Sequence, residues 1–328
     1  MTDLVIPPLV NVPRCPVCSG EGAILYDGLR DRLGDLPGEW RFRRCNAADC
    51  GHLWMDPAIQ ADHLGWAYQD YFTHDGGALP SVSRLGPLGA TLREAGHWLS
   101  GLGPEWRRRK ALFLPDGNSR RVLDVGCGAG ELLAELRSRG WVVEGLEMDP
   151  VAAKATAARL GVTVHVGAIA DVNPENRFDA IVLQHVIEHL PDPRADLQRL
   201  ATWLAPGGTI TLVTPNANSR LHRLFGFHWR ELDAPRHLHL FTPDSLRSIV
   251  GQAGLSMNSI GTSAAANHGV WLASHFIERH GKVATGRLNA RSLAGCYVEL
   301  VRGAVAHWRD SWSGEELVSV QRQSATQR

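Results

Sequence analysis

The sequence has no excess of either charge, since Lys and Arg together number 34 and Asp and Glu also number 34. Proteins that bind the phosphate backbone of nucleic acids usually carry a basic excess. The charge balance therefore argues against general nucleic-acid binding, although it leaves room for a local basic patch. The longest basic run, Arg107 to Lys110, is short enough to be a solvated helix face.

Long apolar runs are also absent. No window approaches the roughly 18 to 20 apolar residues that span a bilayer, and the opening stretch lacks the basic n-region of a signal peptide. We therefore expect a cytoplasmic protein without a transmembrane segment. The 328 residues are 44% hydrophobic and include 11 Trp, which excludes a disordered chain and a disulfide-stapled miniprotein.

Cysteine is scarce, and four of the six cysteines lie close to the start of the chain. Cys15 and Cys18 form a C-x2-C pair, and Cys45 and Cys50 form a second, wider pair. Two such pairs supply the closed set of four thiolates that binds structural zinc. In a cytoplasmic protein, clustered cysteines indicate metal and not disulfides. We predict a structural Zn²⁺ on these four residues and leave open whether His52 replaces one of them.

Three stretches of the chain differ in composition and in the pattern of their apolar residues. Residues 1–60 are rich in Pro, Gly, Cys and Arg, and we interpret them as a small module that needs its metal as a staple. Residues 61–118 place aromatic side chains between Gly and Pro breaks, which predicts a helical connector or lid. From 119 to 328 strands alternate with helices, which is typical of an α/β domain with a parallel sheet.

This alternation predicts a mostly parallel sheet with helices on both faces. The seven strands are expected at 121–125, 142–146, 162–166, 180–184, 209–214, 255–260 and 316–320. Helices are expected at 130–139, 151–160, 194–204 and 243–253. The Pro-Gly-Gly sequence at 206–208 is expected to end the third helix and to turn into the fifth strand.

Residues 263–310 interrupt this rhythm before the last strand. Apolar residues recur there at helical spacing, which predicts a helical insertion whose apolar face consists of Leu293, Tyr297, Leu300, Val301, Ala304, Val305 and Trp308. We favour a cap on the domain or a homodimer contact for this face. A membrane-surface role is a secondary reading, because the segment also contains Arg287, Arg291, Arg302 and Arg309.

The most informative stretch is the end of the first of these strands. Asp124 lies near the strand end, and Gly126, Gly128 and Gly130 lead from it directly into a helix. Glycines let a backbone approach a ligand closely, and a helix N-terminus offers free N–H groups. A carboxylate at this place would repel the pyrophosphate of a dinucleotide, so it suits a cationic or amine-bearing ligand.

The next two strand ends describe the rest of the ligand. Glu147, at the tip of the second strand, can accept hydrogen bonds from both hydroxyls of a ribose. Ala168 and Ile169 follow the third strand, where an apolar side chain can cover an adenine. A ligand with adenine, ribose, an amino-acid tail and no phosphate is S-adenosylmethionine, and we predict it as the cofactor.

Four motifs resemble those of the class I S-adenosylmethionine-dependent methyltransferases: VLDVGCGAG, VEGLEMDP, FDAIVLQHVIEHL and LAPGGTITLVTPN. The resemblance covers roughly residues 119–260 and the closing strand. It implies a Rossmann-like fold and S-adenosylhomocysteine as the product. It also implies that the glycine turn surrounds the methionine part, that Glu147 binds the ribose and that Met148 packs on the adenine.

The cofactor site that we predict from these motifs consists of Asp124, Gly126, Cys127, Gly128, Gly130, Glu147, Met148, Ala168, Ile169, Gln184 and His185. One position departs from the family's pattern. Many members hold the adenine amine with an acidic residue where this chain has Ala168, and Asp171 is the candidate to replace it.

The N-terminal motifs CPVC and RCNAADCGHLWMDP, followed by YQDYF, resemble a zinc-ribbon segment of methyltransferases that act on small molecules, often sugars or glycan precursors. We therefore expect a zinc-ribbon-like module and O-methylation of a small molecule such as a sugar, glycan or natural-product precursor. The motifs are also broadly similar to zinc-bearing ribosomal RNA methyltransferases. Two alternatives thus stay open: an rRNA or tRNA methyltransferase that binds RNA through the zinc module, and a non-catalytic scaffold that binds the cofactor.

An oxygen acceptor must lose its proton during methyl transfer, and His is the usual base near neutral pH. His185 follows the fourth strand, at the sheet edge where open α/β folds bind ligands. Glu188 and His189 match the family's EH pair. After the fifth strand, a W…D-x-P-R-H-L signature similar to that of a subset of these enzymes contains Asp233 and His237. We predict His237 as the base, Asp233 as its orienter and His185 as a further catalytic candidate.

Overall fold

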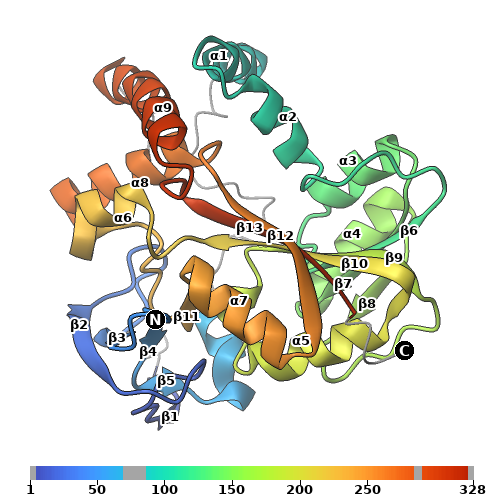
Figure 1. Ribbon diagram of the computed structural model, residues 1–328, viewed down its shortest axis with the longest axis horizontal. Coiled ribbons are helices and arrows are strands. Elements are labelled where there is room, and N and C mark those ends of the chain that lie inside the picture. Colours follow the sequence, from blue (N-terminus) through green and yellow to red (C-terminus); the bar gives the residue numbers. More distant parts are fainter. Residues whose placement is uncertain (1–4, 69–85, 284–289, 324–328) are drawn as a thin grey trace.

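A seven-stranded sheet forms the centre of the computed structural model, which describes residues 5–68, 86–283 and 290–323 (Figure 1). Its strand order is β12-β13-β10-β9-β6-β7-β8, and only β13 runs antiparallel to its neighbours. The predicted fold class is thereby confirmed. The strands are β6 (Arg121–Val125), β7 (Val142–Glu147), β8 (Val164–Val166), β9 (Phe178–Gln184), β10 (Leu204–Pro215), β12 (Leu255–Ser263) and β13 (Glu316–Gln323).

Helices cover both faces of this sheet because alternate residues of each strand are apolar. Val122 of β6 belongs to the core shared with α3, and the next residue, Leu123, belongs to the core shared with α5 and α7. Figure 1 shows the two pairs of helices on opposite sides. They are α3 (Glu131–Ser138) and α4 (Pro150–Leu160) on one side and α5 (Pro193–Thr202) and α7 (Pro243–Gln252) on the other.

The helix starts follow local sequence signals. Asp149 and Asp192 each accept a hydrogen bond from a backbone N–H of the helix that follows, with proline in the first turn. Thr242, immediately before Pro243, forms a reciprocal capping box with Ser245 at the start of α7.

The start of β10 differs from the prediction. The strand begins at Leu204, so it already includes the Pro-Gly-Gly sequence that was expected to precede it. Leu204 pairs with Phe178 before the register shifts at Thr209. Gly208 permits this course, because a Cβ there would lie 2.7 Å from the carbonyl oxygen of Phe178.

The N-terminal residues form more regular structure than their composition indicates. They contain β1 (Leu9–Val10), β2 (Gly22–Leu29), β3 (Trp40–Cys45), β4 (Leu53–Met55) and β5 (Ala58–Ile59). A second sheet has the order β11-β4-β3-β2, and β11 (His239–Leu240) comes from the segment that follows β10. β2, β3 and β4 thus share a sheet with a strand from the later part of the chain, while β1 and β5 pair with each other in a separate sheet.

Two groups of helices complete the fold. The connector contains η1 (Ala61–Tyr68), α1 (Gly86–Leu99) and α2 (Gly103–Lys110), and the segment after β10 contains α6 (Arg220–Phe225). The predicted insertion contains α8 (Asn267–His280) and α9 (Ala290–Arg309), between β12 and β13. Among the described residues, none of the helices combines the length and the apolar character needed to cross a bilayer.

The apolar face predicted on the insertion is only partly buried. Leu300 and Ala304 are buried, whereas Val301 and Trp308 are 53% and 66% exposed. A Cβ on Gly96 of α1 would lie 3.0 Å from Leu300, so α9 packs closely on the connector. Arg287 and the side chains of Arg291 and Leu293 lie outside the described part of the chain.

Candidate functional site

The turn between β6 and α3 leaves open space beside one of its glycines. Gly126, Gly128 and Gly130 all have positive φ, at 71°, 48° and 72°. A Cβ on Gly126 would meet Val186 at 2.7 Å, and one on Gly130 would meet Thr156 at 2.6 Å. A Cβ on Gly128 would meet nothing within 4 Å, so a ligand can approach the backbone there.

Two carboxylates stand next to this turn. Asp124 is buried at the end of β6, while Glu147, at the end of β7, accepts hydrogen bonds from the backbone N–H of Gly128 at 2.8 Å and of Asp149 at 3.0 Å. Burial, helped by the negative charge of Glu147, raises the pKa of Asp124 to about 8. A cation bound beside Asp124 and Glu147 would stabilise the charged form of Asp124 and so lower its pKa again. The two carboxylates therefore fit S-adenosylmethionine, which carries an ammonium and a sulfonium group.

The remaining predicted cofactor residues lie on neighbouring loops. Met148 is 51% exposed after β7, and Ile169 is buried after β8 with Ala168 half-buried before it. The side chain of Asp171 lies beside Gly167, within 4.0 Å of where a Cβ would stand. Gln184 ends β9 and is half-buried. Their contacts with a cofactor stay a prediction.

His185 is held between two carboxylates. Its Nδ1 donates to Glu188 at 3.2 Å and its Nε2 donates to Glu316 at 3.0 Å, in a backbone conformation with a φ of 52°. Burial alone would lower the pKa of His185, but hydrogen bonds to these carboxylates raise it to about 10. The ring therefore keeps both protons at neutral pH, so it has no lone pair with which to accept another.

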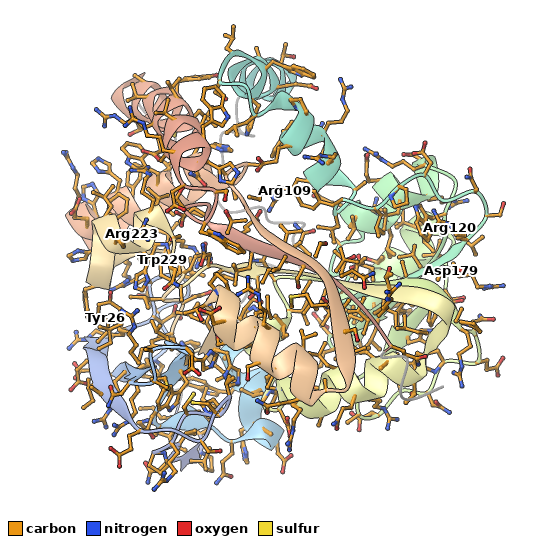
Figure 2. The ribbon with its side chains drawn as sticks, in the orientation of Figure 1. Tyr26, Arg109, Arg120, Asp179, Arg223 and Trp229 are labelled. Atoms are coloured by element: carbon orange, nitrogen blue, oxygen red, sulfur yellow. The ribbon has the colours of Figure 1, made fainter. Side chains whose placement is uncertain are left out.

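Glu316 also connects this histidine to the connector. Glu316 starts β13. Arg109, near the end of α2 and labelled in Figure 2, donates two hydrogen bonds to the Glu316 carboxylate. Because β13 is antiparallel, its first residue lies opposite Pro215, at the carboxyl end of β10. The pairing of Arg109 with Glu316 could not be predicted from the sequence, since the two residues come from segments more than 200 residues apart.

Two more histidines present ring nitrogens next to Glu188. His237 donates from Nδ1 to the carbonyl oxygen of Glu231 at 2.7 Å, and His189 donates from Nδ1 to that of Arg236 at 3.0 Å. In both rings Nε2 is thus the nitrogen with a lone pair. Burial, with His189 beside it, holds the pKa of His237 well below its usual value.

These three side chains form a compact group. One ring nitrogen of His189, one of His237 and a carboxylate oxygen of Glu188 all lie within 4.8 Å of one another. The second oxygen of Glu188 accepts a hydrogen bond from Thr214 at 2.9 Å. Tyr68, the first residue of the YQDYF motif, places its hydroxyl 2.9 Å from His189 Nδ1, a contact that the motif did not predict.

Asp233 does not contact the ring of His237 in the structure. Its carboxylate lies 3.1 Å from Arg236 and 3.5 Å from Arg230. Arg236 also makes two hydrogen bonds to Asp31, at 2.8 and 2.9 Å, and is 2% exposed. Asp233 therefore fixes the loop through Arg236. The role predicted for Asp233, to orient the ring of His237, is taken by the carbonyl oxygen of Glu231.

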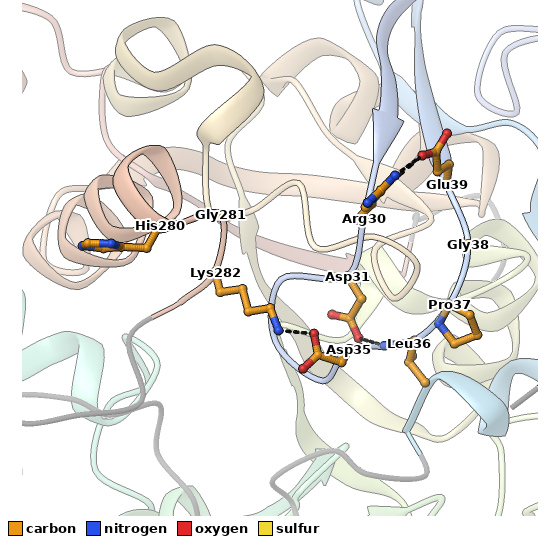
Figure 3. A pocket seen from close by; sticks show the side chains of 10 residues that line it. All are labelled: Arg30, Asp31, Asp35, Leu36, Pro37, Gly38, Glu39, His280, Gly281 and Lys282. Carbon is orange, nitrogen blue, oxygen red and sulfur yellow. Dashed lines mark hydrogen bonds and ion pairs between the residues drawn. The ribbon is translucent and has the colours of Figure 1, made fainter. Parts of the chain in front are cut away.

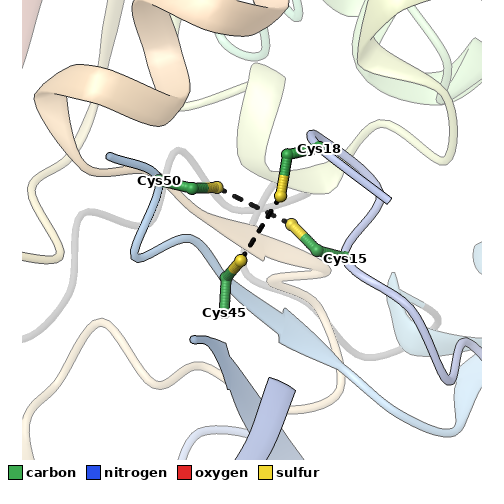
Figure 4. A group of neighbouring side chains, drawn as sticks. All are labelled: Cys15, Cys18, Cys45 and Cys50. Carbon is green, nitrogen blue, oxygen red and sulfur yellow. Dashed lines mark hydrogen bonds between the residues drawn. The ribbon is translucent and has the colours of Figure 1, made fainter. Parts of the chain in front are cut away.

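The four N-terminal cysteines converge as predicted (Figure 4). Cys15 and Cys50 are 3.8 Å apart and Cys18 and Cys45 are 3.4 Å apart, measured between sulfur atoms. Four thiolates at such distances can hold one structural zinc ion. His52 is not part of this group, because its buried ring hydrogen-bonds to His239 at 3.1 Å.

A shallow pocket of about 500 Å³ lies elsewhere, between the loop after β2 and the end of α8 (Figure 3). Ion pairs bridge it, between Lys282 and Asp35 and between Arg30 and Glu39. Its lining comes from the loop between β2 and β3 and from the end of α8, and none of the lining residues lies at the carboxyl end of a strand of the seven-stranded sheet.

Comparison with known proteins identifies the central part of the chain. A family model described as a methyltransferase domain matches residues 97–260, which is half of the chain. The chain is 32% identical over 155 residues to the ubiquinone biosynthesis O-methyltransferase of Pseudomonas fluorescens (strain SBW25), covering 43% of this chain and 66% of the relative. It is 34% identical over 139 residues to that of Bradyrhizobium sp. (strain ORS 278), covering 38% and 54%.

The matched part thus spans less than two thirds of these curated relatives. Among solved structures, a putative sarcosine dimethylglycine methyltransferase from Galdieria sulphuraria is 20% identical, with a TM-score of 0.46 and coverage of 79% of this chain and 98% of that one. Coclaurine N-methyltransferase bound to N-methylheliamine and SAH is 14% identical, with a TM-score of 0.42 and coverage of 66% and 70%.

Proposed function

Because the chain belongs to the S-adenosylmethionine-dependent methyltransferase family, whose domain model matches half of it, we propose that it methylates an oxygen atom of a small molecule. The observation that supports this most directly is the group of Glu188, His189 and His237 beside the glycine turn. Val186, which contacts Gly126, lies in the same short segment as Glu188 and His189. The names of the curated relatives, which are O-methyltransferases, agree with the proposal.

Asp124 and Glu147 are the residues that we assign to the cofactor. When bound, the cofactor supplies an electrophilic methyl group on a cationic sulfur. Asp124 balances positive charge, and Glu147 stands at the tip of β7, where it can accept hydrogen bonds from ribose hydroxyls. Gly128 lets the backbone lie against the ligand, since no side chain occupies the space beside it.

His237 is the residue that we assign to the acceptor. Its Nδ1–H is fixed by the carbonyl oxygen of Glu231, so Nε2 offers its lone pair to an acceptor hydroxyl. The hydroxyl must give up its proton as the new carbon–oxygen bond forms, and S-adenosylhomocysteine leaves. His185 acts as a positioning residue, because both of its nitrogens are engaged by carboxylates.

The proposal is tested with methyl-labelled S-adenosylmethionine and a fractionated cell extract. We expect label in a small-molecule pool with the wild-type protein, and at least tenfold less with His237→Ala. The control is His63→Ala, which removes an exposed histidine and should label like wild type. Label in RNA would show that the acceptor is RNA and not a small molecule. Unimpaired cofactor binding without label in any pool would instead identify a non-catalytic scaffold.

A further inference from the structure

Glu188, His189 and His237 also form a ligand set. Two imidazoles and one carboxylate are the donors of catalytic zinc sites, in which a fourth position stays open. All three donor atoms lie within 4.8 Å of one another. An ion with bonds of about 2.1 Å needs its tetrahedral ligands about 3.4 Å apart, so binding requires the donor atoms to approach one another by at most about 1.4 Å.

The hydrogen bonds around the rings favour this use. Metal-bound histidines almost always donate their other ring N–H to a carbonyl or carboxylate oxygen, which fixes the tautomer. His189 and His237 both do so through Nδ1. Within the described part of the chain, the Nε2 atoms of His189 and His237 have no hydrogen-bond partner. A base that accepts one proton from the acceptor needs only one such nitrogen, whereas a metal site needs both.

Glu188 is prepared in the same way. Its carboxylate is fully buried, and each oxygen is already oriented, one by His185 at 3.2 Å and one by Thr214 at 2.9 Å. A buried carboxylate that is held at both oxygens loses little freedom when it binds an ion. The three ligands come from the segments that follow β9 and β10, which are joined by the hydrogen bond from Leu238 N to the Glu188 carbonyl at 2.8 Å.

We propose that Glu188, His189 and His237 bind one divalent transition-metal ion of the zinc type, separate from the ion of the four cysteines. This inference rests on the proposed function for its role. With one carboxylate and two neutral rings, the ion keeps a net charge of +1 and an open position, which favours an acceptor hydroxyl in its deprotonated form. In the metal-bound protein the lone pair of His237 binds the ion, so His237 acts there as a ligand in place of the base assigned above, and the proton of the hydroxyl leaves to solvent.

The test measures metal binding without any acceptor. Co²⁺ is titrated into full-length protein that retains the zinc of its cysteines, and binding is followed by calorimetry and visible absorption. We expect one further equivalent, without the thiolate charge-transfer absorption that a cysteine site would give. His237→Ala and His189→Ala should each weaken this binding at least tenfold, whereas His63→Ala should bind like wild type.

Two variants are used because either one alone could disturb the fold, which circular dichroism checks. Failure to bind a further equivalent, or binding that both variants leave unchanged, would overturn the metal site. If protein that lacks the additional metal equivalent transfers methyl groups as fast as protein that contains it, the metal site is overturned and the proposed function stays intact. A bound equivalent with no methylated product would support the site and contradict the proposed function.

Discussion

Asp124 links the charge of the cofactor to pH. Its pKa is raised to about 8 by burial and by Glu147, so the carboxyl group is largely protonated at pH 7 in the free protein. A group with a raised acidic pKa makes the free energy of unfolding fall as the pH rises from about 4 towards 8, because the folded state then holds the extra proton. A bound cation lowers the pKa of Asp124 and releases that proton.

We therefore predict that binding of S-adenosylmethionine at pH 7 releases up to one proton, and that the affinity rises with pH up to about 8. Calorimetry in buffers of different ionisation enthalpy measures the release. Asp124→Asn should abolish the release and weaken binding about tenfold or more. Glu135→Gln, which removes the charge of a carboxylate paired with Arg139, is the matched control. The same apparent enthalpy in every buffer would contradict the prediction.

Arg236 shows how a residue beside the site holds two elements together. Its guanidinium joins Asp31, from the loop after β2, to Asp233, from the loop before β11, and all three side chains are at most 2% exposed. Removing one partner of a buried ion pair leaves uncompensated charge. Arg236→Ala should therefore lower the free energy of unfolding by about 3–5 kcal/mol.

Urea unfolding of the full chain measures this loss. The control is Arg247→Ala, which breaks an exposed pair with Asp244 at 2.6 Å and should cost less than about 1 kcal/mol. Equal losses for the two variants would show that burial of the Arg236 pair has no energetic consequence.

At the scale of elements, the sequence predicted best what local pattern determines. The strands of the parallel sheet are apolar runs that end at Gly or at helix caps, so β6 and β9 lie within two residues of their predicted bounds. β11 could not be predicted, because a two-residue strand exists only through its pairing with β4. The pairs of His185 with Glu316 and of His189 with Tyr68 were missed for the same reason, since each joins distant segments.

Zinc bound to the four cysteines should stabilise the rest of the chain as well as the N-terminal module. β4 pairs with β11, and the carbonyl oxygens of Cys50 and Val17 accept hydrogen bonds from Thr242 and Gln252 of the catalytic part. Because metal binding free energy contributes directly to folding, Cys45→Ser should lower the free energy of unfolding by about 3 kcal/mol or more.

Calorimetric unfolding and metal analysis of purified protein test this together. We expect one zinc per chain on the cysteines, one cooperative transition in the wild type, and a lower Tm in Cys45→Ser. Cys296→Ala removes a buried cysteine of α9 and should lose no zinc. Less than one zinc per chain in the wild type would refute the site.

Over the whole molecule, the charges are arranged for internal contacts more than for a polyanion. The net charge is zero, and the basic run at the end of α2 is engaged by its neighbours. Arg109 pairs with Glu316, and the other three cations lie over aromatic rings: Arg107 over Trp98, Arg108 over Phe113 and Lys110 over Trp106. Together with the balanced overall charge, these contacts favour a small acceptor over RNA.

We predict that the protein shows no saturable binding of a single-stranded RNA up to about 10 μM at about 50 mM salt, and no steep dependence on salt. Fluorescence anisotropy measures both. The double variant Arg107→Glu/Arg108→Glu should retain the wild-type rate of label transfer to the small-molecule pool, because neither side chain contacts the residues assigned to the cofactor or acceptor. Micromolar RNA binding that falls steeply between about 50 and 200 mM salt, and that this variant abolishes, would make the RNA methyltransferase the better reading.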